Sequence, residues 1–154
     1  MFNVVLVEPE IPPNTGNVGR LCLATKSKLH LVKPLGFSLD DRQLKRAGLD
    51  YWDEVDLEVW DSLGALQKAN GHARFFYVTT KTRSAYWEAA FRPGDFLIFG
   101  RETKGLPEEL LSANAPACIT IPMEGTRSLN LATAVGIVLF EAIRQQHSGQ
   151  SRVE

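Results

Sequence analysis

Cysteine, histidine and long apolar runs are scarce in this sequence. Its 154 residues include two cysteines and three histidines. No histidine stands at ligand spacing from a cysteine or a carboxylate, so we expect no metal site. Because Cys22 and Cys118 lie within apolar segments, we interpret them as structural thiols of a cytoplasmic protein. No apolar run is long enough to span a bilayer, and the segment 1–7 lacks the basic leader of a signal peptide.

Two common site motifs are also missing. The sequence contains no Gly-x-Ser-x-Gly, the turn that presents a hydrolase nucleophile. Gly16 and Gly19 are not followed by the third glycine of a dinucleotide fingerprint, nor by the Lys-Ser/Thr ending of a phosphate-binding loop. These absences leave hydrolase, metalloenzyme and nucleotide-dependent oxidoreductase activities without support.

Net charge is also small, at −1, so the total does not indicate a nucleic-acid partner. The distribution is uneven, because basic residues gather between 20 and 46 and acidic residues between 50 and 61. We interpret the basic segment as a face that meets phosphates, with an ordinary solvated surface as the alternative.

Strand-like and helix-like segments alternate along the chain. We expect strands at 2–7, 29–32, 55–60, 74–79, 95–100 and 118–121 and helices at 40–47, 61–71, 107–113 and 129–146. Another helix begins only at Asn14 or Thr15, because prolines precede it. Asp61 caps one helix and Gly48 ends another.

This alternation predicts an α/β fold with a mostly parallel sheet flanked by helices. We expect residues 1–154 to form one domain, with 148–154 as a frayed tail.

The helix expected at 129–146 is apolar on more than one side. Its two stripes are Ala132, Val135, Leu139 and Ile143, and then Leu131, Ala134, Val138 and Ala142. One stripe packs on the sheet, and we expect a second subunit to cover the other, giving a homodimer. Burial of the whole helix within one subunit is the alternative.

Three segments that follow expected strands combine glycine with polar side chains, at 14–20, 99–107 and 121–132. Loops at strand ends are the usual ligand sites of α/β sheets, so we expect one composite site. The glycines of the first two loops allow the backbone to approach a ligand or to adopt unusual angles. Glu102 stands where it can accept hydrogen bonds from the first loop or from a ligand. Asn130 either caps the last helix or belongs to the site.

In these segments the chain resembles the SPOUT methyltransferases, specifically the SpoU class of RNA ribose 2′-O-methyltransferases. The three motifs of that class occur here as Asn14-Thr15-Gly16-Asn17-x-x-Arg20, Leu97-Ile98-Phe99-Gly100-Arg101-Glu102-Thr103-Lys104-Gly105-Leu106, and Ile121-Pro122-Met123 followed by Ser128-Leu129-Asn130-Leu131-Ala132. The stretches 8–17 and 46–51 are similar to a small subgroup that methylates the wobble nucleotide of tRNA, cytidine or uridine 34. The resemblance covers essentially the full length.

The resemblance implies properties that spacing alone does not. They are a C-terminal deep trefoil knot, S-adenosyl-L-methionine as the cofactor, a homodimer with sites near the subunit interface, and the anticodon stem-loop of tRNA as the partner. From the residues themselves we expect a cytoplasmic enzyme with no metal and no membrane contact. The alternatives are methylation of another RNA such as rRNA, methylation of a base, and a catalytically inactive knotted RNA-binding protein.

The resemblance also implies roles for single residues. Arg20, on the side of its helix that faces the loop mouth, contacts the ribose hydroxyl or its phosphate and acts as the base or stabilises the alkoxide. The other catalytic positions are Asn14 and Glu102, which hold Arg20 and the loops, and Ser128 and Asn130. The cofactor-binding positions are Val78, Thr79, Gly100, Glu102, Ile121, Met123, Ser128 and Leu129. The RNA-binding positions, chosen by charge, are Arg20, Lys26, Lys28, Arg42, Lys45 and Arg46.

Overall fold

The structure, a computed structural model, describes residues 1–147, and the tail predicted at 148–154 lies outside the described residues. Within 1–147, six parallel strands form one sheet in the order β3-β2-β1-β5-β4-β6. The strands are β1 (Asn3–Val7), β2 (Lys28–Val32), β3 (Leu57–Trp60), β4 (Phe75–Val78), β5 (Phe96–Phe99) and β6 (Cys118–Ile119). The predicted α/β class and parallel sheet are confirmed.

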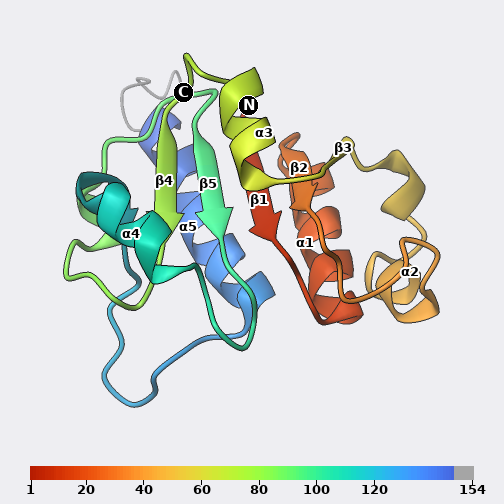
Figure 1. Ribbon diagram of the computed structural model, residues 1–154. Coiled ribbons are helices and arrows are strands. Elements are labelled where there is room, and N and C mark those ends of the chain that lie inside the picture. The colour runs from red at the N-terminus through yellow and green to blue at the C-terminus, as the bar shows by residue number, and fades with distance from the viewer. Residues whose placement is uncertain (148–154) are drawn as a thin grey trace.

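Helices cover both faces of this sheet (Figure 1). On one face lie α1 (Pro12–Ala24) and α5 (Leu131–His147), and on the other lie α3 (Leu63–Ala69) and α4 (Glu108–Ala113). Beside α1 packs α2 (Arg42–Ala47). Short 3-10 turns occur at Trp52–Glu54, Tyr86–Glu88 and Ala115–Ala117.

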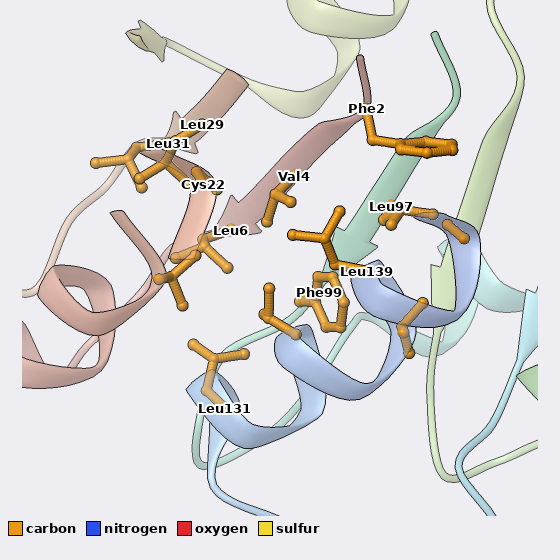
Figure 2. Close-up of a cluster of buried hydrophobic side chains, with 14 of the residues drawn as sticks. Phe2, Val4, Leu6, Cys22, Leu29, Leu31, Leu97, Phe99, Leu131 and Leu139 are labelled. Atoms are coloured by element: carbon orange, nitrogen blue, oxygen red, sulfur yellow. The ribbon is translucent and has the colours of Figure 1, made fainter. Parts of the chain in front are cut away.

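Side chains of β1 alternate between two buried clusters, because successive residues of a strand point to opposite faces. Val4 and Leu6 belong to the cluster beneath α1 and α5, whereas Val5 and Val7 belong to the cluster beneath α3 and α4. Figure 2 shows the first cluster, with Leu139 of α5 beside the strand side chains. Burial on both faces explains why these strands read as continuous apolar runs.

α1 begins earlier than expected, so the start predicted at Asn14 or Thr15 is wrong. Pro12 and Pro13 occupy the first two helical positions, where a missing amide hydrogen costs no helical hydrogen bond. The N-cap is Ile11, which makes no side-chain capping bond. Asn14 is therefore a buried residue inside the first turn, and its side chain is available for contacts outside α1.

Of two other predicted helix signals, the Asp61 cap is wrong and the stop at Gly48 is confirmed. The cap of α3 is Ser62, whose hydroxyl accepts a hydrogen bond from the Ala65 amide at 3.0 Å, and not Asp61. Gly48 ends α2 in a right-handed conformation, with φ of −75°. The left-handed angles that follow α2 belong to Leu49 and Asp50, at 49° and 64°.

α5 buries a single mixed face, so the prediction of two separate stripes is wrong. The buried residues come from both stripes and are Leu131, Val135, Val138, Leu139 and Ala142. They cover the broad arc that a helix packed on a sheet buries. On the outer side Ile137 is half-buried and Phe140 is 52% exposed. Within residues 1–147 we find no helix that is both long and apolar enough to cross a membrane.

Candidate active site

A pocket of about 480 Å³ opens at the carboxyl edge of the sheet, where β4, β5 and β6 end. All three loops reach it, the first through Asn14, the second through 99–106 and the third through residues of 121–131. Ile11, which precedes the first loop, also lines it. The carboxyl ends of parallel strands share one edge, so loops far apart in sequence meet there. The volume is in the range of pockets that hold small molecules.

The lining includes all the residues that the resemblance assigned to the cofactor. They are Val78, Thr79, Gly100, Glu102, Ile121, Met123, Ser128 and Leu129, joined by Asn14 and Asn130. Sequence reasoning missed further lining residues, which are Thr80, Lys81, Arg101, Lys104 and Thr120. Their adjacency to assigned residues on the same loops was the signal available in the sequence. The chemical roles of all these residues stay predictions.

Glu102 joins the second loop to residues 10–11, which precede the first loop, and not to the first loop itself. Its carboxylate accepts hydrogen bonds from the backbone amides of Glu10 and Ile11, at 2.9 and 3.2 Å. Pro12 and Pro13 follow immediately and carry no amide hydrogen. The carboxylate therefore sits at the positive end of α1, where negative charge is favourable.

Glu10 makes the reverse connection. Its Oε1 accepts hydrogen bonds from the amide and the hydroxyl of Thr103, at 3.2 and 2.7 Å. These bonds lower the pKa of Glu10, and the nearby charges of Arg101 and Lys104 lower it further. Arg101 also pairs with Glu8 at 3.1 Å. Reciprocal contacts thus connect the second loop to residues 8–11, which lead into α1, along one wall of the pocket.

Asn14 and Asn130 tie α1 to α5. Nδ2 of Asn130 donates to Oδ1 of Asn14 at 3.0 Å. Oδ1 of Asn130 accepts from the amides of Ala132 and Thr133, at 2.9 and 3.3 Å. Asn130 is therefore the cap of α5, and the same side chain contacts the first loop at the pocket.

The glycines of the first loop serve helix packing, so the prediction that they admit a ligand is wrong. A Cβ on Gly16 would lie 2.2 Å from the carbonyl oxygen of Leu44 in α2. A Cβ on Gly19 would lie 2.6 Å from the ring of Trp52. Without side chains here, α1 contacts its neighbours more closely than any other residue would allow.

Gly100 has a similar role inside the second loop. This loop folds back on itself, with the amide of Gly105 donating to the carbonyl of Arg101 at 2.9 Å. A Cβ on Gly100 would lie 2.2 Å from the carbonyl carbon of Gly105. Gly105 has a φ of +65°, the unusual angle expected of it. Both glycines therefore shape the loop before any ligand binds.

Arg20 lies outside the lining of this pocket. It is exposed on α1, six residues after Asn14, which places the two side chains about 120° apart around the helix. Asn14 bonds instead to Asn130, and Glu102 bonds to backbone amides. The predicted contacts of Asn14 and Glu102 with Arg20 are therefore not formed between the described residues. These side chains hold α1 itself, on which Arg20 is carried.

The residues of the predicted basic face are divided between the two ends of the parallel strands, some at the amino ends and some towards the carboxyl ends. Lys28 is the first residue of β2, at the edge remote from the pocket, and it pairs with Glu58 at 2.8 Å. Lys26 precedes it. The remaining positions, Arg42, Lys45 and Arg46, lie on α2, towards the edge to which the strands point (Figure 1). Lys45 pairs with Asp40 at 3.7 Å. The prediction of one continuous basic face is therefore wrong. Lys26 and Lys28 lie at the amino end of β2, and the residues of α2 lie towards the carboxyl ends of the strands.

Both cysteines are buried and free. Burial raises the pKa of the Cys22 thiol to about 12, so it stays protonated and unreactive. Burial also raises the pKa of Cys118, whose Sγ donates to the carbonyl of Asn114 at 3.4 Å. Among residues 1–147, no cluster of histidine, cysteine and carboxylate side chains has the arrangement of a metal site.

Comparison with known proteins agrees with the motifs. The model of the SpoU rRNA Methylase family matches residues 1–140. The tRNA (cytidine(34)-2′-O)-methyltransferase of Burkholderia pseudomallei (strain 1106a) is 51% identical over 150 residues, 94% of this chain and 96% of the relative.

Two solved structures share the fold. One, described as giving structural insights into the 2-OH methylation of C/U34 on tRNA, has a TM-score of 0.90 and 49% identity, and the match covers 95% of this chain and 96% of that one. An AdoMet-bound rRNA methyltransferase from Sinorhizobium meliloti has a TM-score of 0.83 and 26% identity, covering 93% of this chain and 56% of that one. The predicted resemblance is confirmed, and the chain belongs to the SpoU rRNA methylase family.

Proposed function

We propose that this protein transfers a methyl group from S-adenosyl-L-methionine to the ribose 2′-hydroxyl of the wobble nucleotide of tRNA, cytidine or uridine 34. The observation that carries the proposal is the meeting of the three family motifs at one pocket. The relative from Burkholderia pseudomallei whose name gives that activity is 51% identical, and the match covers nearly the full length of both chains.

The residues of the pocket fit this cofactor. Apolar side chains of Val78, Ile121 and Leu129 offer a surface for a flat ring, and backbone groups of the second and third loops surround it. Glu102 already accepts two amide hydrogen bonds, so it holds the wall of the pocket. We assign Ser128 to a polar contact with the cofactor. When bound, S-adenosyl-L-methionine supplies an electrophilic methyl group.

The chain itself must position the acceptor hydroxyl and manage its charge. We assign this to Arg20. Its planar fork can donate to the ribose oxygen and to a neighbouring phosphate together, and so stabilise the developing alkoxide. Removal of the hydroxyl proton by Arg20 itself is the alternative. The Asn14–Asn130 bond and the Glu102 contacts hold α1 against the pocket.

We also propose a homodimer that forms across the groove between α1 and α5. Leu21 of α1 and Ala132, Gly136 and Ile137 of α5 line a shallow, mostly apolar depression. Phe140, one turn further along α5, is 52% exposed. Asn17, three residues before Arg20 and on the same side of α1, also lines this depression, so a second copy seated there lies close to Arg20. A two-fold contact of this kind uses the same patch on both subunits.

Three further assignments follow from the family. We propose that the segment leading into α5 threads the second loop and forms a trefoil knot, since residues of 100–106 and 121–131 line one pocket. We propose that the anticodon stem-loop is the part of tRNA that is bound. The proposed substrate places the reaction in the cytoplasm.

Two measurements test the activity. By titration calorimetry, S-adenosyl-L-methionine should bind at one site per chain, and NAD should not bind. With radiolabelled cofactor, label should enter tRNA and not rRNA. Label in rRNA alone would favour the rRNA alternative, and cofactor binding without transfer to any RNA would favour an inactive RNA-binding protein.

A further inference from the structure

Ion pairing divides the lysine and arginine side chains of residues 1–147 into two sets. One set pairs with carboxylates and consists of Lys28, Lys33, Lys45, Arg74, Lys81, Arg101 and Arg144. The other set has no carboxylate partner in that range and consists of Arg20, Lys26, Arg42, Arg46, Lys68, Arg83, Arg92, Lys104 and Arg127. Unpaired cations are available to an external anion, so their positions are informative.

Three of the unpaired cations lie on the loops that line the pocket. Lys104 lines it directly. Arg83 lies two residues after Lys81, which also lines it, and Arg127 immediately precedes the lining residue Ser128. Each comes from a different loop at the carboxyl edge of the sheet, and all three side chains are exposed.

Most carboxylates near the mouth are already engaged. Glu8 pairs with Arg101, and Glu108 pairs with Lys81 at 2.9 Å. Glu10 and Glu102 accept the hydrogen bonds that join residues 10–11 to the second loop. Glu124, which is exposed on the same loop as Arg127, forms no ion pair with a residue of 1–147. Arg83, Lys104 and Arg127 are therefore the cations of these loops without a carboxylate at ion-pair distance, while Glu10, Glu102 and Glu124 keep their negative charges outside the ion pairs of residues 1–147.

We propose that Arg83, Lys104 and Arg127 form a phosphate-binding rim that holds single-stranded RNA while its ribose lies at the mouth of the cofactor pocket. The proposal rests on the proposed function and adds the path of the RNA backbone. A polyanion gains affinity from such cations by releasing counterions, without needing a shaped cavity for each phosphate. Because the three cations lie on separate loops, they can contact successive phosphates of a flexible strand more readily than they can all contact a single small anion.

The same chemistry, an anion held by cations, could instead serve the carboxylate of the cofactor. Arg83 and Arg127 do not line the pocket, whereas Lys104 does. The proposal therefore predicts that Arg83 and Arg127 bind RNA and not the cofactor. Substitution of these two arginines distinguishes binding of RNA phosphates from binding of the cofactor carboxylate.

The first experiment compares two charge-matched double variants. R83Q/R127Q removes two unpaired cations from the rim. K68Q/R92Q removes two exposed, unpaired cations that precede β4 and β5, at the opposite edge of the sheet. For each, the affinity for tRNA is measured between 50 and 200 mM salt, and the affinity for S-adenosyl-L-methionine by calorimetry.

For R83Q/R127Q the slope of log affinity against log salt should fall in magnitude by about 1.4, since each phosphate contact of a single strand contributes about 0.7. Adding Lys104→Gln should lower it by about 0.7 more. Cofactor affinity should stay within twofold for the arginine double variant. K68Q/R92Q should keep the wild-type slope, and R83K/R127K, which retains both charges, should restore most of it.

An unchanged slope in R83Q/R127Q would overturn the rim. So would weaker cofactor binding with an unchanged slope, because the cations would then serve the cofactor. Methylation by the wild-type protein reports separately on the proposed function. If the wild type binds tRNA with a slope that the rim variants reduce, yet methylates none of it, the rim stands and the proposed function fails.

Discussion

At the scale of single residues, the site depends on side chains that bond to backbone. Glu102 accepts hydrogen bonds from the two backbone amides that precede α1, and Asn130 accepts hydrogen bonds from two backbone amides in the first turn of α5. Both residues are visible in the sequence as polar groups at strand ends. Their partners are not, because Glu10 and Glu102 are separated by 92 positions along the chain.

Arg20 is the residue on which the proposed chemistry depends most. Arg20→Ala should lower methyl transfer by about 10²- to 10⁴-fold, the range for loss of a group that manages the acceptor proton. Cofactor affinity should change by less than a few fold, because Arg20 does not line the pocket. Arg20→Lys should rescue little, since lysine lacks the planar fork. Single-turnover kinetics with labelled cofactor, together with calorimetry, measure both. Near-normal turnover in Arg20→Ala would contradict this mechanism.

His30 makes the stability of the fold depend on pH. It is 2% exposed, between Asn3 and Trp60. The indole of Trp60 donates to Nδ1 at 2.9 Å, so the proton is on Nε2, which donates to Oδ1 of the Asn3 side chain at 2.9 Å. Burial, with a smaller effect of Lys28, lowers its pKa from 6.5 to about 4. As pH falls from 6.5 towards 4, the unfolded chain binds a proton that the folded chain does not, so stability is lost in that window.

The measurement is the urea midpoint at pH 7.5 and at pH 5.0. The wild-type midpoint should be lower at pH 5.0. His30→Gln should show a smaller difference between the two values, although its midpoint at pH 7.5 is lower because packing around Trp60 is disturbed. An equal difference in both proteins would assign the pH dependence to other groups.

At the scale of elements, α5 shows the limit of periodicity. Its apolar content and length were predicted correctly within two residues at each end. The face it buries was not, because so many of its residues are apolar that several arcs fit the pattern equally well. Packing on the sheet selects among them, and that choice depends on the positions of β1, β5 and α1.

Two charge substitutions on α5 separate core from interface. Leu139 is fully buried, so Leu139→Glu should prevent folding, because an unpaired charge is then placed in the core. Ile137 lies on the outer groove, so Ile137→Glu should leave the fold intact and dissociate the dimer. Circular dichroism and sedimentation velocity distinguish the two outcomes. A wild-type protein that sediments as a 17.1 kDa monomer would remove the dimer from the account.

The second loop should be sensitive to substitution of Gly100. A Cβ on Gly100 meets the backbone of Gly105, so a substitution here disturbs the loop itself as well as the cofactor site. Gly100→Ala should therefore lower the free energy of unfolding, by about 1–3 kcal/mol as for other overpacked sites, and weaken cofactor binding as well. Gly125→Ala, with nothing within 4 Å of its Cβ, is the control and should leave the melting temperature unchanged. Equal melting temperatures for both variants would contradict this role.

At the scale of the whole molecule, the sequence predicts the layers and the location of the site better than the surface. Alternating apolar strands and helices are a local signal, and the rule that loops gather at the carboxyl edge is general. The division of the basic residues follows from strand direction, which puts Lys28 at one edge and Arg46 at the other. The pairing of Lys28 with Glu58 depends on two neighbouring strands and has no local signal. The lack of a carboxylate partner for Arg83 and Arg127 also has no local signal, because it depends on which residues fold next to them.

The most direct test of the account is the position of the transferred methyl group. Total tRNA from a strain that lacks this enzyme is incubated with the protein and radiolabelled S-adenosyl-L-methionine, and labelled tRNA is digested and mapped by nucleotide. The account predicts label on the ribose 2′-oxygen of cytidine or uridine 34, and none with Arg20→Ala. Label on a base, at another position of tRNA or only in rRNA would contradict it.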